Sequence, residues 1–355
     1  MDYILLRKCS GNSFCHYGHR IQIGLLRLLQ CWLEQRLSEL RKEVKLALGD
    51  RQTDSQLADV AGHYFAEGGK LIRPRLILLT AATLGSSQQP GQEEPGVSAG
   101  QARIAAIAEM IHTASLVHDD IIDESDTRRG RPSVHAKFGN KAAVLAGDFI
   151  LAIATKLLCS LGNPEVIRIL AQVIEDLVRG EFMQMGDRDG FDARFAHYMG
   201  KTFKKTASLF AYSCEAVAAL SADVGKRSLA FEFGKQFGLA FQLVDDILDC
   251  SATEEALGKP TGADLRLGLA TAPLLFASRN QPALEPLIRR RFSEKGDVEQ
   301  ALAMIHQGQG ISEARRFAES HAKEAARLAE KLGPAASHFT QSLRHLALAQ
   351  TSRLR

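Results

Sequence analysis

The stretch DDIID at residues 119–123 decides the fold of this chain, because it recurs as DDILD at residues 245–249. Each copy ends an apolar run with helical spacing, and residues four apart lie on one face of an α-helix. The first and last acids of each copy therefore stack, and they repel by about a few tenths of a kcal/mol on an exposed helix. A magnesium-like ion, which prefers oxygen ligands and also binds substrate phosphates, would remove that repulsion. Two such helices facing each other would grip one polyphosphate through shared metal ions.

Composition narrows the class of protein. The 355 residues are 45% hydrophobic and 24% charged, as in ordinary soluble globular proteins. A net charge of +3 is too small to indicate nucleic acid as a partner. The six cysteines have no paired spacing, which favours reduced thiols in an intracellular protein. We expect no transmembrane helix, since the nearest candidate, residues 142–158, is interrupted by Asp148 and Lys156.

Helical periodicity runs through most of the chain, and neither an alternating strand nor a clear linker is evident. We expect one all-α, layered helical domain over residues 31–355. The expected helices cover residues 31–48, 55–66, 101 to the first acidic stretch, 141–161, 166–186, 195–220, 227–249 and 313–331, the last with Ser312 as its N-cap. Residues 1–30 contain four Lys or Arg and a single acid, Asp2. That start suits a mitochondrial transit peptide, or else a plain basic extension.

Cationic residues follow the acidic stretches at short spacing. Arg128 lies five residues past Asp123, close enough to contact the same diphosphate. Arginine clamps phosphate oxygens through two parallel hydrogen bonds, and lysine adds a point charge. Further candidates for this role are Arg129, Lys205 and Lys259. A second anion pocket is expected from Lys70, Arg73 and His112, the last of which is two helical turns before Asp119.

Seven segments, taken together and in this order, resemble the trans-isoprenyl diphosphate synthases: GGKLIRP, EMIHTASLVHDDIIDESDTRRG, AGDFILA, IEDLVRGE, FKKTASL, FQLVDDILD and GKPTGADL. The resemblance covers about residues 61–276. The residues around these motifs are most similar to the long-chain polyprenyl (solanesyl or decaprenyl) diphosphate synthases of the ubiquinone pathway, and they resemble the catalytic subunit of such enzymes. One DDxxD is weak evidence, but two of them with GGKxxRP, RR and KT are specific. The resemblance implies an isoprenoid-synthase-type helical bundle around a central cavity.

The resemblance also implies roles for single residues. Asp119, Asp123 and Asp245 would hold Mg²⁺, with Asp249 as a weaker candidate. The allylic diphosphate would bind Arg128, Lys205, Thr206, Gln242 and Lys259, with Thr206 and Gln242 facing the allylic carbon. Isopentenyl diphosphate would bind Lys70, Arg73, His112 and Arg129. The reaction implied is ionisation of the allylic diphosphate, attack by the isopentenyl double bond, and loss of a proton to the departing diphosphate.

Product length is expected to depend on Ala114 and Ser115, five and four residues before the first acidic stretch. If this helix lines the tunnel for the growing chain, both positions face the tail. Short-chain members of the family carry bulky aromatic residues there, whereas small residues leave the tunnel open.

Several alternatives remain at this point. The chain could be a short-chain synthase making C15 or C20 products, a non-catalytic subunit of a heteromeric synthase, or a helical scaffold with a structural metal. The family implies farnesyl or geranylgeranyl diphosphate as the allylic primer, and a homo-oligomer or a hetero-oligomer with a second subunit. It also suggests contact with a membrane surface for product release. The expected location is the mitochondrial matrix, with the cytoplasm as the alternative.

Overall fold

The protein is described from a computed structural model that covers residues 15–49, 55–65, 69–86, 96–128, 130–184, 186, 188–251 and 261–354, with side chains from residue 28 onward. The helices are α1 (Cys15–Leu48), α2 (Ser55–Gly62), α3 (Ile72–Gly85), α4 (Ala99–Ile122), α5 (Val134–Phe138), α6 (Asn140–Cys159), α7 (Pro164–Gln184), α8 (Phe191–Thr202), η1 (Phe203–Ala207), α9 (Ser208–Ala219), η2 (Val224–Lys226), α10 (Arg227–Ser251), α12 (Ala263–Arg266), α13 (Ala272–Ser278), α14 (Leu284–Arg289), α15 (Asp297–Gln307), α16 (Gly310–Leu332) and α17 (His338–Ser352). Within these ranges the only strands are β1 (Thr127–Arg128) and β2 (Arg131–Pro132), which pair antiparallel. The all-α expectation is confirmed.

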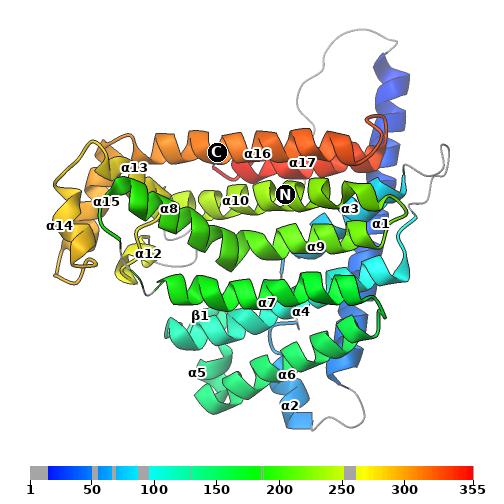
Figure 1. Ribbon diagram of the computed structural model, residues 1–355, viewed down its shortest axis with the longest axis horizontal. Coiled ribbons are helices and arrows are strands. Elements are labelled where there is room, and N and C mark those ends of the chain that lie inside the picture. The colour runs from blue at the N-terminus through cyan, green and yellow to red at the C-terminus, as the bar shows by residue number, and fades with distance from the viewer. Residues whose placement is uncertain are drawn as a thin grey trace.

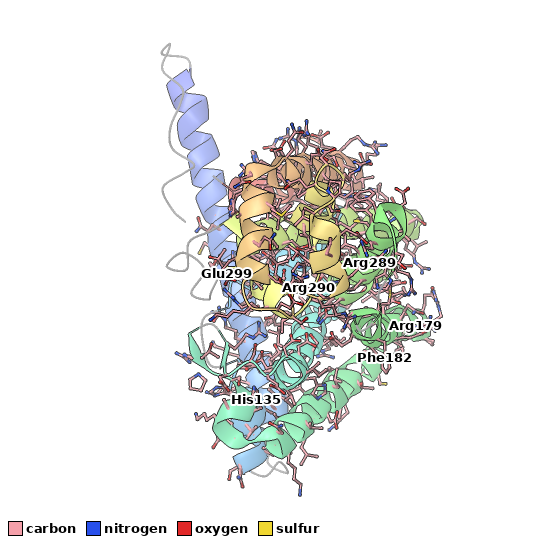
Figure 2. All side chains as sticks on the ribbon, turned by 90° about the vertical axis from the view of Figure 1, so that its left-hand side faces the viewer. His135, Arg179, Phe182, Arg289, Arg290 and Glu299 are labelled. Carbon is pink, nitrogen blue, oxygen red and sulfur yellow. The ribbon has the colours of Figure 1, made fainter. Side chains whose placement is uncertain are left out.

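Helix α10 lies at the centre of the bundle, between α16 and α17 on one side and α9 and α7 on the other (Figure 1). The C-terminal ends of α4 and α10, which carry the two acidic stretches, lie at the same end of the molecule (Figure 1). The short helices α12 to α15 gather at that end, and Figure 2 looks onto it. The fold therefore brings together two stretches that are more than a hundred residues apart.

The core explains why α9 and α10 are held so close. Phe233 and Phe237 of α10 are fully buried, as their helical spacing predicts, and the ring of Phe237 lies 5.2 Å from that of Phe210 on α9. Gly234 permits the approach, because a Cβ atom there would lie 2.5 Å from the carbonyl oxygen of Phe210. Any larger residue would push the helices apart.

Four expected helix boundaries are wrong. The helix expected over residues 55–66 ends at Gly62. Helix α1 begins at Cys15 rather than Cys31, and no proline in this region stops the helix from extending. The helix expected over 195–220 begins at Phe191 and is interrupted by the π-helical turn η1. Ser312 is not an N-cap, since α16 begins at Gly310 and the Ser312 hydroxyl donates to the carbonyl of Gln309.

Helix α6 is the one helix in the described part of the chain that is long and apolar enough to cross a membrane. That is weak evidence for a span, because helices in protein cores pass the same test. Here α6 packs against α4, α5 and α2, and seven of its residues are buried.

A paired charge at the end of the bundle gives a prediction about stability and pH. The guanidinium of Arg194, 6% exposed, donates from both terminal nitrogens to Glu285, at 2.6 and 3.0 Å, and so joins α8 to α14. Hydrogen bonds from Arg194 and Arg289 lower the pKa of Glu285 from 4.5 to about 2. The stabilisation is therefore complete above about pH 4.5 and is lost as the pH falls toward 2.

We expect Glu285→Gln to lower the free energy of unfolding by about 1 kcal/mol at pH 7, with a smaller difference below pH 4.5. Urea unfolding of both proteins from pH 3 to 7 measures this. Glu294→Gln is the control, because its contact with Arg290 is exposed and longer, at 3.6 Å. A difference that does not vary with pH would contradict this account of the pair.

Candidate active site

The π-helical turn η1 is the centre of the site. It lies between α7 and α10, and both helices approach it through a glycine. A Cβ atom on Gly180 would lie 2.8 Å from the backbone nitrogen of Lys205, and one on Gly238 would lie 2.6 Å from the Cα of Ala207. Single π turns inside α-helices are rare and often mark functional sites. The two glycines hold this one against its neighbours on both sides.

Each polar side chain of this turn is bonded to a neighbouring helix. Lys204 contacts the buried carboxylate of Asp176 at 2.5 Å and so fastens the turn to α7. The ammonium of Lys205 lies 2.6 Å from Glu181 and 3.1 Å from the side-chain oxygen of Gln184. The hydroxyl of Thr206 donates to Gln242 of α10 at 2.7 Å. Lys205, Thr206 and Gln242, predicted as one group, are thus brought together.

In the first acidic stretch the middle carboxylate has a different role from its neighbours. Asp120 is fully buried and accepts hydrogen bonds from the guanidinium of Arg128 and the hydroxyl of Tyr64. These hydrogen bonds position Arg128, which is the last residue of β1 and pairs with Arg131 of β2. Arg129 lies outside the described residues.

Asp119 and Asp123 lie close to several charged side chains, both acidic and basic. Burial raises the pKa of Asp119 from 3.8 to about 6, and the carboxylates of Glu181 and Asp123 push it in the same direction while Lys205 and Arg128 oppose them. Burial also raises the pKa of Asp123, again with Glu181 adding and Lys205 opposing. Burial opposes the ammonium form of Lys205, but Asp119 and Glu181 outweigh it and raise the pKa of Lys205. Three carboxylates thus share one partly desolvated ammonium.

In the second acidic stretch each of the three carboxylates has a different set of hydrogen-bond partners. Asp245 accepts from Arg353, beyond the end of α17, at 2.7 Å. Asp246 is buried, accepts from Tyr198 at 2.5 Å and Gln242 at 2.7 Å, and has a pKa raised to about 6 chiefly by burial. Asp249 accepts from the backbone N–H of Asp264 at 3.1 Å and so binds the first turn of α12 to α10.

One cavity joins the two stretches. It has about 570 Å³ of empty space, its open mouth included, and Asp123 lines one side while Asp246 lines the other. The lining also includes Gln184, Tyr198, Lys201, Lys205, Thr206, Gln242 and Asp264. Carboxylates and ammonium groups therefore converge on one space at the end of the bundle. Lys259 lies outside the described residues.

Of the residues expected in the second anion pocket, Arg73 lies in the first turn of α3 and Lys70 lies just before that helix. The guanidinium carbon of Arg73 lies 4.8 Å from the ring centre of Phe210 and 5.9 Å from that of Phe241. Arg353 lies over the same Phe241 ring at 5.3 Å, so it connects this region to Asp245. Lys70 is exposed, and Leu71 beside it has the left-handed backbone conformation (φ 47°), which is costly for a branched residue.

The remaining predicted residues lie on α4. His112 is half-buried, and its carbonyl accepts from the hydroxyl of Ser115 at 2.9 Å. Ala114 is completely buried in the main core, and Ser115 is half-buried.

Several residues of the site were not predicted from the sequence: Asp120, Glu181, Gln184, Tyr198, Lys201, Asp246, Asp264 and Arg353. Glu181 is the last residue of the motif IEDLVRGE, and Gln184 follows one helical turn later on the same helix, which is a signal that could have been used. Nothing in the sequence places Arg353 beside Asp245, because that contact depends on the tertiary fold.

The donors fit a divalent cation. Asp119 and Asp123 are oxygen ligands whose pKa values are raised by burial and by neighbouring carboxylates, and a divalent cation would relieve that penalty. Among the described residues, no group of three or more His, Cys, Asp or Glu is arranged to hold a metal by itself. A magnesium-like ion bound by one or two carboxylates keeps coordination positions for diphosphate oxygens.

Comparisons with known proteins show the family and the fold. The structure is similar to that of a polyprenyl synthase from Caulobacter crescentus complexed with calcium and isoprenyl diphosphate, with a TM-score of 0.80, 31% identity, and coverage of 93% of this chain and 97% of that one. The fold and site thus define the class of isoprenyl diphosphate synthases. A sequence model of the polyprenyl synthetase family matches residues 54–305, and the chain belongs to that family.

Two relatives make the likeness more specific. The human all trans-polyprenyl-diphosphate synthase PDSS1 is 46% identical over 297 residues, which are 83% of this chain and 69% of that protein. A probable mitochondrial hexaprenyl pyrophosphate synthase from Neurospora crassa is 50% identical over 233 residues, which are 63% of this chain and about half (52%) of that protein. The predicted resemblance to long-chain polyprenyl synthases is confirmed.

Burial and the neighbouring carboxylates predict that the ionised side chain of Asp119 lowers the free energy of unfolding. Its folded pKa is raised, so the ionised form is disfavoured by folding; this penalty is absent below pH 3.8 and complete above about pH 6. We expect Asp119→Asn, in EDTA at pH 7, to raise the free energy of unfolding by about 1–3 kcal/mol.

Chemical unfolding at pH 7 and pH 4 tests this, and the gain should disappear at pH 4. Asp126→Asn, in an exposed position seven residues later, is the matched control. A destabilised Asp119→Asn protein at pH 7 would show that the carboxylate contributes to folding and would contradict the electrostatic account.

Proposed function

We propose that this chain catalyses the Mg²⁺-dependent head-to-tail (1'-4) condensation of isopentenyl diphosphate with an allylic diphosphate, and makes a long-chain all-trans polyprenyl diphosphate, the precursor of the ubiquinone side chain. One observation supports this most directly. A single cavity is lined by one carboxylate from each acidic stretch, Asp123 and Asp246, together with Lys205, Thr206 and Gln242. Membership of the polyprenyl synthetase family and the names of the relatives support the same activity.

In this proposal residues that line the cavity, or lie next to those that do, bind and orient the allylic diphosphate. Arg128, fixed by Asp120, and Lys205, fixed by Glu181 and Gln184, present charged donors to its oxygens. Asp119, Asp123 and Asp245 would hold Mg²⁺, which supplies Lewis-acid neutralisation of the departing diphosphate. At Asp245 the metal ion would share the carboxylate with Arg353, which contacts Oδ1.

After ionisation, side-chain dipoles stabilise the allylic cation, and no protein side chain is needed as the base that removes the proton. The oxygens of Thr206 and Gln242, held 2.7 Å apart, direct their dipoles at the positive charge that develops on the allylic carbon. Arg73, His112 and Lys70, with Arg129, would orient isopentenyl diphosphate for attack. The departing diphosphate then takes the proton, so no further titratable side chain is required.

Purified protein with Mg²⁺, labelled isopentenyl diphosphate and farnesyl or geranylgeranyl diphosphate tests the activity. We expect long-chain products, and we expect Asp119→Ala to lower turnover by at least about a hundredfold, because it removes charge stabilisation of the transition state. Asp59→Ala, exposed on α2, is the control. Near-normal turnover by a folded Asp119→Ala protein would refute the assignment, and activity that appears only with a second subunit would show a hetero-oligomer.

The length of the product is a further prediction. If α4 lines the tunnel for the growing chain, then Ala114→Phe shortens the product sharply. Since Ala114 is fully buried and a phenylalanine can overpack the core, Ser115→Phe at the half-buried neighbouring position is the second variant. Chromatography of the dephosphorylated products decides, and an unchanged long product from both folded variants would refute the tunnel geometry. The same analysis of the unmodified protein would reveal C15 or C20 products, if the chain were a short-chain synthase.

We also propose that two copies of the chain associate through an apolar face on α6 and α7. This face includes Val144 and Leu145 on α6, and Val178 and Phe182 on α7, with Phe182 70% exposed. Figure 2 shows Phe182 and Arg179 at the outer edge of the molecule. Exposed apolar clusters of this kind are typical of interaction surfaces.

Phe182→Glu should convert the oligomer to smaller species, because it places a charge in the contact, while Val224→Glu, also exposed, should not. Light scattering after size-exclusion chromatography measures the mass. If the unmodified protein is a monomer, this interface is wrong. The mitochondrial matrix is the proposed location, on the basis of the basic N-terminal segment and the name of the Neurospora relative.

A further inference from the structure

A second cavity lies beside the catalytic one and has a basic lining. One wall is a single face of α8, formed by Arg194, His197, Tyr198 and Lys201, which are spaced three or four residues apart. Arg188 after α7 and Arg291 after α14 complete the rim. The empty space, its open mouth included, is about 540 Å³. Basic side chains from α8 and from the segments after α7 and α14 thus surround one concave space.

Basic side chains line both the rim and the inner part of this cavity. Arg194 is neutralised by Glu285, so its contribution is small. Arg188 and Arg291 are exposed at the rim, and Lys201 is half-buried at the inner end. No carboxylate is present among the described residues that line the space. Basic side chains that surround a concave space favour a compact polyanion.

The two cavities share part of their lining: Gln184, Tyr198, Lys201 and Leu269 belong to both. Tyr198 is held in place by its hydrogen bond to Asp246 of the second acidic stretch. From the catalytic side, the charges of Asp246 and Asp264 act on Lys201. Lys201 therefore lines both cavities where they adjoin. Gln184 also lines both, and its side-chain oxygen accepts a hydrogen bond from Lys205, the proposed diphosphate ligand.

We propose that this basic cavity binds a diphosphate group outside the catalytic cavity, at a site formed by Arg188, Lys201 and Arg291. The choice of diphosphate rests on the proposed function, since that reaction releases inorganic diphosphate at each addition and takes in isopentenyl diphosphate for the next. Either the departing anion or the headgroup of an incoming substrate has the chemistry that the cavity recognises. Because the two cavities share a wall, Lys201, Arg188 and Arg291 would provide cationic contacts for either anion between the catalytic cavity and solvent.

The double variant Arg188→Gln/Arg291→Gln tests the site without altering a catalytic residue. Both side chains are exposed, so we expect the fold to be retained. Calorimetric titration with inorganic diphosphate in EDTA, and then with isopentenyl diphosphate, measures binding directly. Steady-state inhibition by inorganic diphosphate measures the same interaction during turnover. Lys295→Gln, an exposed lysine four residues past Arg291 that does not line the cavity, is the matched control.

We expect the double variant to weaken binding of inorganic diphosphate, and inhibition by it, by at least about tenfold, because two charged donors are lost. Initial rates measured with added pyrophosphatase should stay within about twofold of the unmodified protein, and Lys295→Gln should change neither quantity. A parallel rise in the KM for isopentenyl diphosphate would assign the cavity to the incoming headgroup as well, and an unchanged KM would assign it to the departing anion alone.

Unchanged binding of both anions by the folded double variant would overturn the proposal. This outcome is distinct from failure of the proposed function, which would appear as absence of polyprenyl product in the unmodified protein. The calorimetric titration gives its answer in either case.

Discussion

The structure depends on a concentration of carboxylates around one ammonium group. Asp119, Asp123 and Glu181 come from two helices, and Lys205 lies among them in a place with little water. Such an arrangement is unfavourable for the protein alone, because burial and mutual repulsion both oppose ionisation. The rest of the fold compensates elsewhere, through the aromatic core of α9 and α10 and the hydrogen bonds between Arg128 and the buried Asp120. The penalty is relieved when a divalent cation and a diphosphate enter.

Close helix packing makes this arrangement rigid. Gly180 and Gly238 allow α7 and α10 to approach the π turn to within contact of its backbone, where a side chain would have to displace it. The turn then presents Lys205 to one neighbour and Thr206 to the other. Positions held in this way need no reorganisation when charge develops during a reaction, which is the usual origin of electrostatic catalysis.

Much of the fold and part of the site could be predicted from the sequence. Helical periodicity gave the helices, and the spacing of the acids placed the two stretches at helix ends. The periodicity could not show the π turn, because it arises from packing against Gly180 and Gly238 and leaves the apolar pattern intact. Spacing also could not separate the acids within each stretch: Asp120 and Asp246 are buried and paired with side chains from distant segments, which only the tertiary structure reveals. The contact of Arg353 with Asp245 spans more than a hundred residues and was missed for the same reason.

The central claim is that the two acidic stretches bind metal ions together with a diphosphate, and not alone. Calorimetric titration of Mg²⁺ into the protein, with and without a non-hydrolysable diphosphate analogue, tests it most directly. The account predicts weak binding of Mg²⁺ to the protein alone and at least about tenfold tighter binding with the analogue, a gain that is lost when either Asp119 or Asp245 is replaced by alanine. Equally tight binding without the analogue, or binding that does not depend on Asp245, would contradict it.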